Sequence, residues 1–151
     1  MQKLIALKNH IEASGLFNPE RVIEYAEEGT AHTSFSTSGP DLLLCRHAYT
    51  GVIELWGASG SLGHLLAMVL TWLDANGGDE DALSSWSGEP VDRARADITL
   101  RLTLEEDARY VPKGAYAGKD VLTFEGTEWR PGEAVADKAT TLEGDGVVIQ
   151  P

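Results

Sequence analysis

The stretch that most constrains the fold is residues 62–76, which read LGHLLAMVLTWLDAN. Its apolar residues recur at i, i+3, i+4, i+7 and i+11, which is the spacing of one helical face; they are Leu62, Leu65, Leu66, Val69 and Leu73. Ser61 can cap the first turn, and Asn76 and Gly77 tolerate the backbone that ends a helix. Three further apolar residues lie off this stripe: Met68, Leu70 and Trp72. Such a helix must be covered on two sides, by a sheet and by either another helix or another chain.

Residues 96–105 form the cleanest predicted strand. Four apolar residues point one way, and they are Ile98, Leu100, Leu102 and Leu104. Four polar residues alternate with them, namely Asp97, Thr99, Arg101 and Thr103. A period of two places one face on the core and leaves the other in water or against a partner. We expect Leu66 and Leu73 of the helix to face this sheet and to be nearly fully buried.

The remaining elements are shorter or less regular. A second amphipathic helix is expected over 2–14, ended by Gly15. Strands are expected at 21–25 and weakly at 31–35, followed by a loop at 36–40, with a further short strand opening at Trp86. Residues 42–45 and 49–56 form either one long bent strand or two strands joined near His47. The pattern predicts an α+β fold in which two helices pack on a mainly antiparallel sheet.

The chain changes character after Pro112, where glycines recur. Only residues 121–124 are expected to form a strand there, and the glycines are expected to break the rest. We therefore predict an α+β domain over 1–112 and an extended Gly-rich C-terminal arm over 113–151 that neighbouring subunits order. Trp129 and Arg130 are the candidate partner contact, because Trp and Arg are enriched at interface hot spots. A tryptophan packed against its own domain is the alternative.

The net charge argues against specific binding of nucleic acids. The 24 acidic and 12 basic residues give a net charge of −12, which repels phosphate backbones. The single cysteine, Cys45, cannot form an internal disulfide and is expected to be a buried thiol. No apolar run is long enough to span a bilayer, and the N-terminal residues do not resemble a signal peptide. We expect synthesis in the cytoplasm and no membrane partner.

Motifs that would carry chemistry are incomplete. Residues 57–63 precede a helix as a phosphate loop does, but the lysine of such a loop is missing. Residues 74–81 are rich in carboxylates, but their spacing differs from a calcium loop. The four histidines are scattered, and no nucleophile is paired with a base in the sequence. These patterns predict no enzyme activity, no cofactor and no metal; the alternative is a monomeric small-molecule or cation-binding α+β domain that uses one of the two loops.

The order of elements from Asn18 to Val111 resembles the tail completion protein R family of contractile-tailed bacteriophages. The segments that carry the resemblance are Asn18-Pro19-Glu20, Tyr49-Thr50 with Val52-Ile53, Leu65 through Leu73 with Asn76, and Ala96 through Glu105. None of them is a catalytic signature, so the resemblance lies in their combined order and spacing.

This resemblance implies a tail terminator role. Such a structural virion protein forms a hexameric ring on the head-proximal end of the tail tube, stops tube growth and joins the tail to the head. The implied partners are further copies of the chain, the tail tube protein and the head-tail connector or neck protein, and a contact with the tail sheath stays open. The implied location is the neck region of the virion tail, after assembly in the host cytoplasm.

In such a ring the DNA passes through the centre without specific binding. The channel wall should then be acidic or neutral, and the acidic excess of this chain suits that requirement. The candidate channel-lining residues are Glu105, Glu106 and Asp107, which follow the clean strand. They are favoured over Asp79, Glu80 and Asp81, because strand ends in ring proteins can project inward together.

Overall fold

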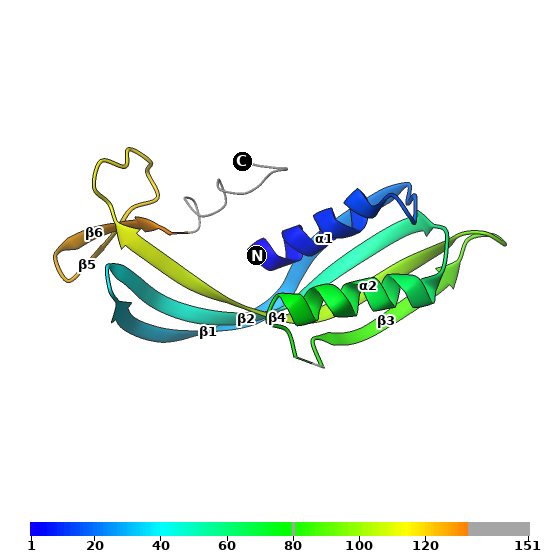
Figure 1. Cartoon of the computed structure of the whole chain (residues 1–151), viewed down its shortest axis with the longest axis horizontal. Helices are drawn as coiled ribbons and strands as arrows, with labels where there is room; N and C mark the ends of the chain where they lie inside the picture. The colour runs from blue at the N-terminus through cyan, green and yellow to red at the C-terminus, as the bar shows by residue number, and fades with distance from the viewer. Residues whose placement is uncertain (80, 133–151) are drawn as a thin grey trace. The chain divides into compact units, whose positions relative to one another are not determined.

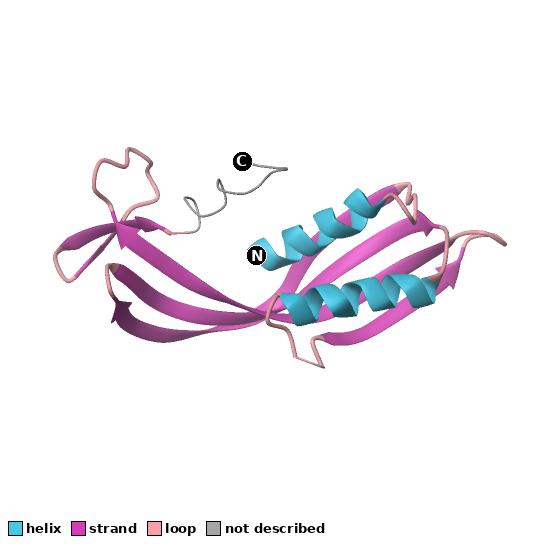
Figure 2. Ribbon diagram, viewed as in Figure 1, coloured by secondary structure: helices cyan, strands magenta, loops and turns pink. Residues whose placement is uncertain are grey.

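The computed structural model describes residues 1–79 and 81–132. Its elements, in chain order, are α1 (Gln2–Ser14), β1 (Arg21–Ser38), β2 (Asp41–Ala58), α2 (Leu62–Ala75), β3 (Leu83–Pro90), β4 (Ala96–Pro112), β5 (Leu122–Phe124) and β6 (Thr127–Pro131). Figures 1 and 2 show how these helices and strands are arranged. The predicted α+β class, with two helices on a mainly antiparallel sheet, is confirmed. No helix among the described residues has the length and apolar character needed to cross a membrane.

The strands pair in the order β1-β2-β4-β6-β5, and β3 also pairs with β4. β3 and β4 are antiparallel, from the pair of Leu83 and Leu102 to the pair of Pro90 and Ala96. β6 is antiparallel to the end of β4 and to β5. Residues 42–56 belong to one strand, and β1 continues through most of the predicted loop at 36–40. Pairing across the β1–β2 hairpin supplies hydrogen-bond partners to a segment whose own sequence indicates a loop.

Clustering of contacts divides the chain into two units. The first unit is 1–30 with 47–106, and the second is 31–46 with 107–151, of which the structure describes 107–132. The division predicted from the sequence, a domain over 1–112 and an arm over 113–151, concerns folding units in solution and stays a prediction.

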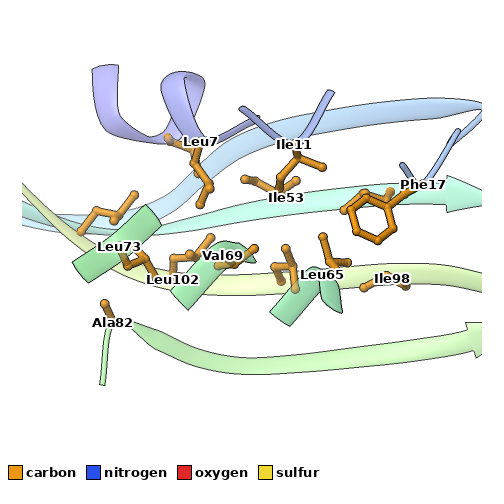
Figure 3. Packing of buried hydrophobic residues seen from close by; sticks show 14 of the residues in the cluster. Leu7, Ile11, Phe17, Ile53, Leu65, Val69, Leu73, Ala82, Ile98 and Leu102 are labelled. Atoms are coloured by element: carbon orange, nitrogen blue, oxygen red, sulfur yellow. The ribbon is translucent and has the colours of Figure 1, made fainter. Parts of the chain in front are cut away.

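The core of the first unit lies between the two helices and one face of its strands. Figure 3 shows side chains of α1, α2, β2 and β4 pointing into this layer. The predicted alternation in β4 is confirmed, because its four apolar side chains are all buried. Leu4, Leu7 and Ile11 form the buried face of α1. Gly51 lets α1 approach β2, since an added Cβ there would lie 2.8 Å from Cδ1 of Leu4.

Helix α2 begins and ends where the sequence predicts. The Ser61 hydroxyl accepts a hydrogen bond of 3.2 Å from the amide of His64, and Gly77 follows the helix with φ of 83°. Its fully buried side chains are Leu65, Val69 and Leu73. Leu73 is 2% exposed, as predicted, whereas Leu66 is only half-buried, so the prediction for Leu66 was wrong.

The correction for Leu66 follows from helix geometry. Leu65, Val69 and Leu73 are spaced by four residues and point at the sheet, while Leu66 lies about 100° further around the helix. Helix α1 lies beside α2 and supplies the second cover that the sequence required. Leu70 stays 44% exposed.

In the second unit, β5 and β6 form a hairpin whose two turn residues have positive φ, 50° at Glu125 and 79° at Gly126. This matches the turn type that two-residue hairpins favour. The predicted strand near 121–124 is confirmed as β5, but the expectation that glycines break everything else was wrong at β6. Gly126 lies in the turn, where its freedom is needed, and not in the strand. Residues 133–151 of the predicted arm lie outside the described part of the chain.

Candidate interaction surfaces

Within residues 1–79 and 81–132, no three His, Cys, Asp or Glu side chains are grouped so that they could hold a metal ion. Cys45 is half-buried, which corrects the expectation of a buried thiol. It lies in the part of β2 that belongs to the second unit and is not a member of the main buried cluster.

Glu106, one of the candidate channel residues, is occupied by the start of α1. Its carboxylate accepts hydrogen bonds from the amides of Gln2 at 3.0 Å and Lys3 at 2.9 Å, and from the hydroxyl of Tyr49. The N-terminal ammonium of Met1 lies 3.2 Å from the same carboxylate, whose side chain is 9% exposed. A carboxylate in this position satisfies free amides of the first helical turn and complements the helix dipole.

The environment of Glu106 changes two pKa values. Burial by itself would raise the pKa of Glu106, but the hydrogen bonds from Tyr49, Lys3, Gln2 and the N-terminus outweigh it and lower that pKa. Burial and the hydrogen bond to Glu106 raise the pKa of Tyr49 far above its ordinary value. Glu106 is therefore ionised and Tyr49 neutral near pH 7.

The other acidic candidates are placed differently. Glu105 is exposed, and its neighbours in a surface hollow include Asp79, Asp81 and Lys3. The loop carboxylates are the sequence-based alternative to the strand-end group, yet the fold brings two of them, Asp79 and Asp81, to the same hollow as Glu105. Glu80 lies outside the described residues.

Asp107 belongs to the second unit, where its carboxylate accepts a hydrogen bond of 2.8 Å from Nε of Arg46. The assignment of Glu105, Glu106 and Asp107 to a channel stays a prediction.

Trp129 and Arg130 are both half-buried in β6. Trp129 pairs with Leu122 of β5 and Pro112 of β4, and its buried indole Nε1 has no hydrogen-bond partner among the described residues. The Arg130 guanidinium lies 5.6 Å from the ring centre of Tyr116. Both side chains thus pack partly on their own unit, and their role as a partner contact stays a prediction.

A surface that sequence reasoning did not assemble lies on the side of the first unit's sheet opposite the helices. We call it the helix-free face; on β1, β2 and β4 it includes Arg21, Tyr25, Glu27, Val52, Glu54, Trp56, Asp97 and Arg101. Glu54 joins two of its aromatic residues, because one carboxylate oxygen accepts from Tyr25 Oη and the other from Trp56 Nε1, each at 2.9 Å. The Arg21 guanidinium lies 5.2 Å from the centre of the Trp56 ring. Both rings remain exposed, Tyr25 by 37% and Trp56 by 40%.

A second hydrogen-bonded pair of side chains lies on the same face. Arg101 of β4 donates a hydrogen bond to Glu27 of β1, and β2 lies between these strands. Val52 of β2 is on this face, outside the main core cluster, and is 0% exposed. Val52 is thus buried although it is not part of the cluster beneath the helices.

The helix-free face is slightly acidic. Arg21 and Arg101 carry two positive charges, and Glu27, Glu54 and Asp97 carry three negative ones. Hydrogen bonds from Trp56 and Tyr25 lower the pKa of Glu54, and the bond to Glu54 raises the pKa of Tyr25. The alternation in β4 indicated an outer face, but it could not show which residues of β1 and β2 would meet there.

Comparison with known proteins adds the decisive observation. The family model of the P2 phage tail completion protein R (GpR) matches residues 1–133. The chain belongs to that family. The match includes every described residue, so both units of this tail completion protein are family features. No protein of curated function and no solved structure matches the chain.

The resemblance seen in the sequence is therefore confirmed. A tail completion protein is a structural component of the phage tail, which places this protein in the virion tail and in contact with other tail components.

Proposed function

We propose that this tail completion protein forms a hexameric ring on the head-proximal end of the tail tube. There it ends tube polymerisation and joins the tail to the head connector. The family match over residues 1–133 is the observation that carries this proposal. Its partners are further copies of itself, the tail tube protein and the head-tail connector or neck protein. The tail sheath is a further candidate partner. Its place is the neck, after assembly in the host cytoplasm.

The distribution of apolar side chains supports a protein with several contacts. Ile5 and Leu70 are exposed on the helical layer, and Tyr25 and Trp56 on the helix-free face. A closed ring needs two different surfaces on each subunit, because each neighbour is met in a heterologous contact. A terminator needs further surfaces for the tube and for the head. Exposed apolar residues on both layers meet that requirement.

The DNA would pass through the ring without specific binding. Of the three candidates, Glu105 and Asp107 are proposed to line the channel, because the Glu106 carboxylate is already bonded to the start of α1. Glu106 contributes by fixing α1 beside the strand that carries its two neighbours.

The test is polymerisation of purified tube protein with and without this chain. We expect tubes to stop growing when it is added, with one cap on a single end of each tube in electron micrographs. The mass of the cap should be six times the chain mass of 16.3 kDa. Tubes that grow to the same length with and without the protein would overturn the proposal.

Order of addition provides the control. Protein added to tubes that have already been capped by a first, labelled batch should leave the label in place and add no second cap. Random binding along the tube wall would instead contradict a role at the tube end.

A further inference from the structure

We propose that Asn76, at the end of α2, is a site of spontaneous covalent modification, in which the backbone nitrogen of Gly77 displaces the side-chain nitrogen of Asn76 as ammonia. The reaction converts Asn76 into aspartate and isoaspartate, and water is its only co-reactant. It involves a single chain and does not depend on the proposed ring.

The sequence contains the reactive pair of residues once. Asn76 is the only one of the three asparagines that precedes a glycine. Glycine has no Cβ, so its backbone nitrogen can approach the preceding side chain without steric hindrance. The other two asparagines are internal contrasts, because Asn9 precedes His10 inside α1 and Asn18 precedes Pro19, whose nitrogen carries no proton.

The chemical step is an intramolecular acyl transfer. The Gly77 nitrogen forms a bond to Cγ of Asn76, the bond between Cγ and Nδ2 breaks, and the proton of the Gly77 amide leaves with Nδ2 as ammonia. Water then opens the cyclic imide at either of its carbonyl groups. Opening at one carbonyl yields aspartate, and opening at the other yields isoaspartate, whose main chain runs through the former side chain. No atom is oxidised or reduced.

The end of α2 controls access to this reaction. Asn76 has φ of −115° and ψ of 24°, which turns the Gly77 nitrogen away from the Asn76 side chain. Nδ2 of Asn76 donates to the Trp72 carbonyl at 2.8 Å, and the amides of Asn76 and Gly78 donate to the Leu73 carbonyl at 3.1 and 2.8 Å. These bonds belong to the last turn of the helix, and helix ends open at a lower free-energy cost than the core. The reaction therefore proceeds through brief opening of this turn.

Lys3 provides a charge that favours the reaction. A Cβ added to Gly77 would lie 3.8 Å from Nζ of Lys3, so this ammonium group is beside the reacting peptide. Lys3, Asn76 and Gly77 all line the surface hollow that contains Glu105. Attack by the Gly77 nitrogen develops negative charge on the side-chain oxygen of Asn76, and a nearby cation stabilises such a charge. The product carboxylate has the same cation as a neighbour.

The product changes the end of α2. A carboxylate cannot donate a hydrogen bond to the Trp72 carbonyl, and a negative charge is unfavourable at a helix C-terminus. The new carboxylate also joins Asp79, Asp81 and Glu105 in the hollow. Modified molecules should therefore have a less stable last turn of α2.

The test is incubation of the purified chain at neutral pH, next to a free peptide of residues 70–82. Peptide mapping by mass spectrometry follows the conversion of each asparagine. We expect Asn76 to react more slowly than in the peptide but more than about tenfold faster than Asn9, because glycine follows it and the helix end opens. Asn18 should not react by this route. An Asn76 that stays intact while the peptide is converted would overturn the proposed site, and conversion as fast as in the peptide would overturn its control by α2.

Lys3→Gln tests the contribution of charge, and Lys119→Gln is the matched control in a loop of the second unit. We expect Lys3→Gln to slow the conversion of Asn76 about two- to fivefold, which is the effect of one solvent-exposed charge interaction, and Lys119→Gln to leave it unchanged. Circular dichroism checks that both variants fold. Equal rates in the wild type and folded Lys3→Gln would remove Lys3 from the site.

Asn76→Asp reproduces one of the two products and tests the structural consequence. The amide of Gly78 should exchange its hydrogen faster in Asn76→Asp than in the wild type, because its bond to the Leu73 carbonyl lies in the weakened turn. Unchanged exchange would show that the modification leaves the end of α2 intact and would overturn this part of the proposal.

Discussion

Glu106 shows how one side chain fixes a helix to a sheet. Its carboxylate receives two backbone amides of α1 and the Tyr49 hydroxyl, at a sequence separation of about 100 residues from the helix. Removing one partner of such a buried, charge-assisted network leaves donors unsatisfied. Glu106 is thus a determinant of stability in a segment where the neighbouring Glu105 is exposed.

We predict that Glu106→Gln lowers the free energy of unfolding by about 1–3 kcal/mol at pH 7. The folded-state pKa of Glu106 is lowered, so its contribution is complete above the unfolded-state pKa, about 4.3, and is lost as pH falls through the folded-state value. The difference between the wild type and Glu106→Gln should therefore shrink as the pH falls below about 5. Urea unfolding at pH 7, 5 and 4 measures it, with Glu105→Gln as the exposed neighbour control. A difference that is constant over this pH range would contradict the assignment.

The two leucines of α2 give a second prediction at the same scale. Leu73→Ala should cost about 2–5 kcal/mol, because Leu73 is 2% exposed and faces the sheet. Leu66→Ala should cost less, about 1–2 kcal/mol, because its side chain is only half-buried. Reversible denaturation of both variants checks the order, and a larger loss for Leu66→Ala would show that the face of α2 is misassigned.

Among the elements, the β5–β6 hairpin shows how a glycine-rich segment gains structure. Gly126 is in the turn, and the strands that flank it pair with each other and with the end of β4. Two further backbone bonds hold the segment, from Lys113 to the Glu128 carbonyl at 3.0 Å and from Gly132 to the Arg109 carbonyl at 2.8 Å. The hairpin therefore uses β4 as its template.

We predict that amide hydrogen exchange is slow in the bonded parts of this segment and fast in its loop. In the isolated protein, the amides of Lys113 and Gly132 should exchange more slowly than those of the loop at 117–121, because both are bonded to strand carbonyls. For residues 133–151 the prediction from the sequence is retained: unprotected amides in the isolated protein, and protection on assembly. Equally fast exchange over all of 113–132 would contradict the hairpin.

At the scale of the whole molecule, the acidic excess favours solubility and the passage of DNA, but it opposes ring closure because like charges on neighbouring copies repel. At physiological salt, charges separated by more than about 8 Å are largely screened, which allows acidic groups to line a water-filled channel. Contacts between copies must still overcome the repulsion that remains.

We predict that particles carrying Glu105→Lys with Asp107→Lys assemble normally but eject DNA poorly, because lysines on the wall would bind phosphates. Glu106 is left unchanged, since its replacement would disturb α1. The neutral pair Glu105→Gln with Asp107→Asn is the control and should eject normally. Assembled and ejecting particles are counted for each; normal ejection with the lysines would remove these residues from the channel.

The sequence by itself determined the elements whose signal is local. Helix α1 and helix α2 follow from apolar residues at helical spacing, and β4 follows from strict alternation, because burying one face requires that spacing. The same reasoning placed Leu73 in the core. It misplaced Leu66, because the edge of a helical stripe is decided by what packs beside it.

Tertiary structure alone decided the features that depend on distant residues. The full length of β1 comes from pairing with β2, the role of Glu106 from helix α1, and the shared hollow from the meeting of Asp79 with Glu105. The helix-free face joins side chains of three strands, and no local pattern shows which of them will meet. Periodicity reports which face of an element is buried, but contacts across the fold decide which side chains act together.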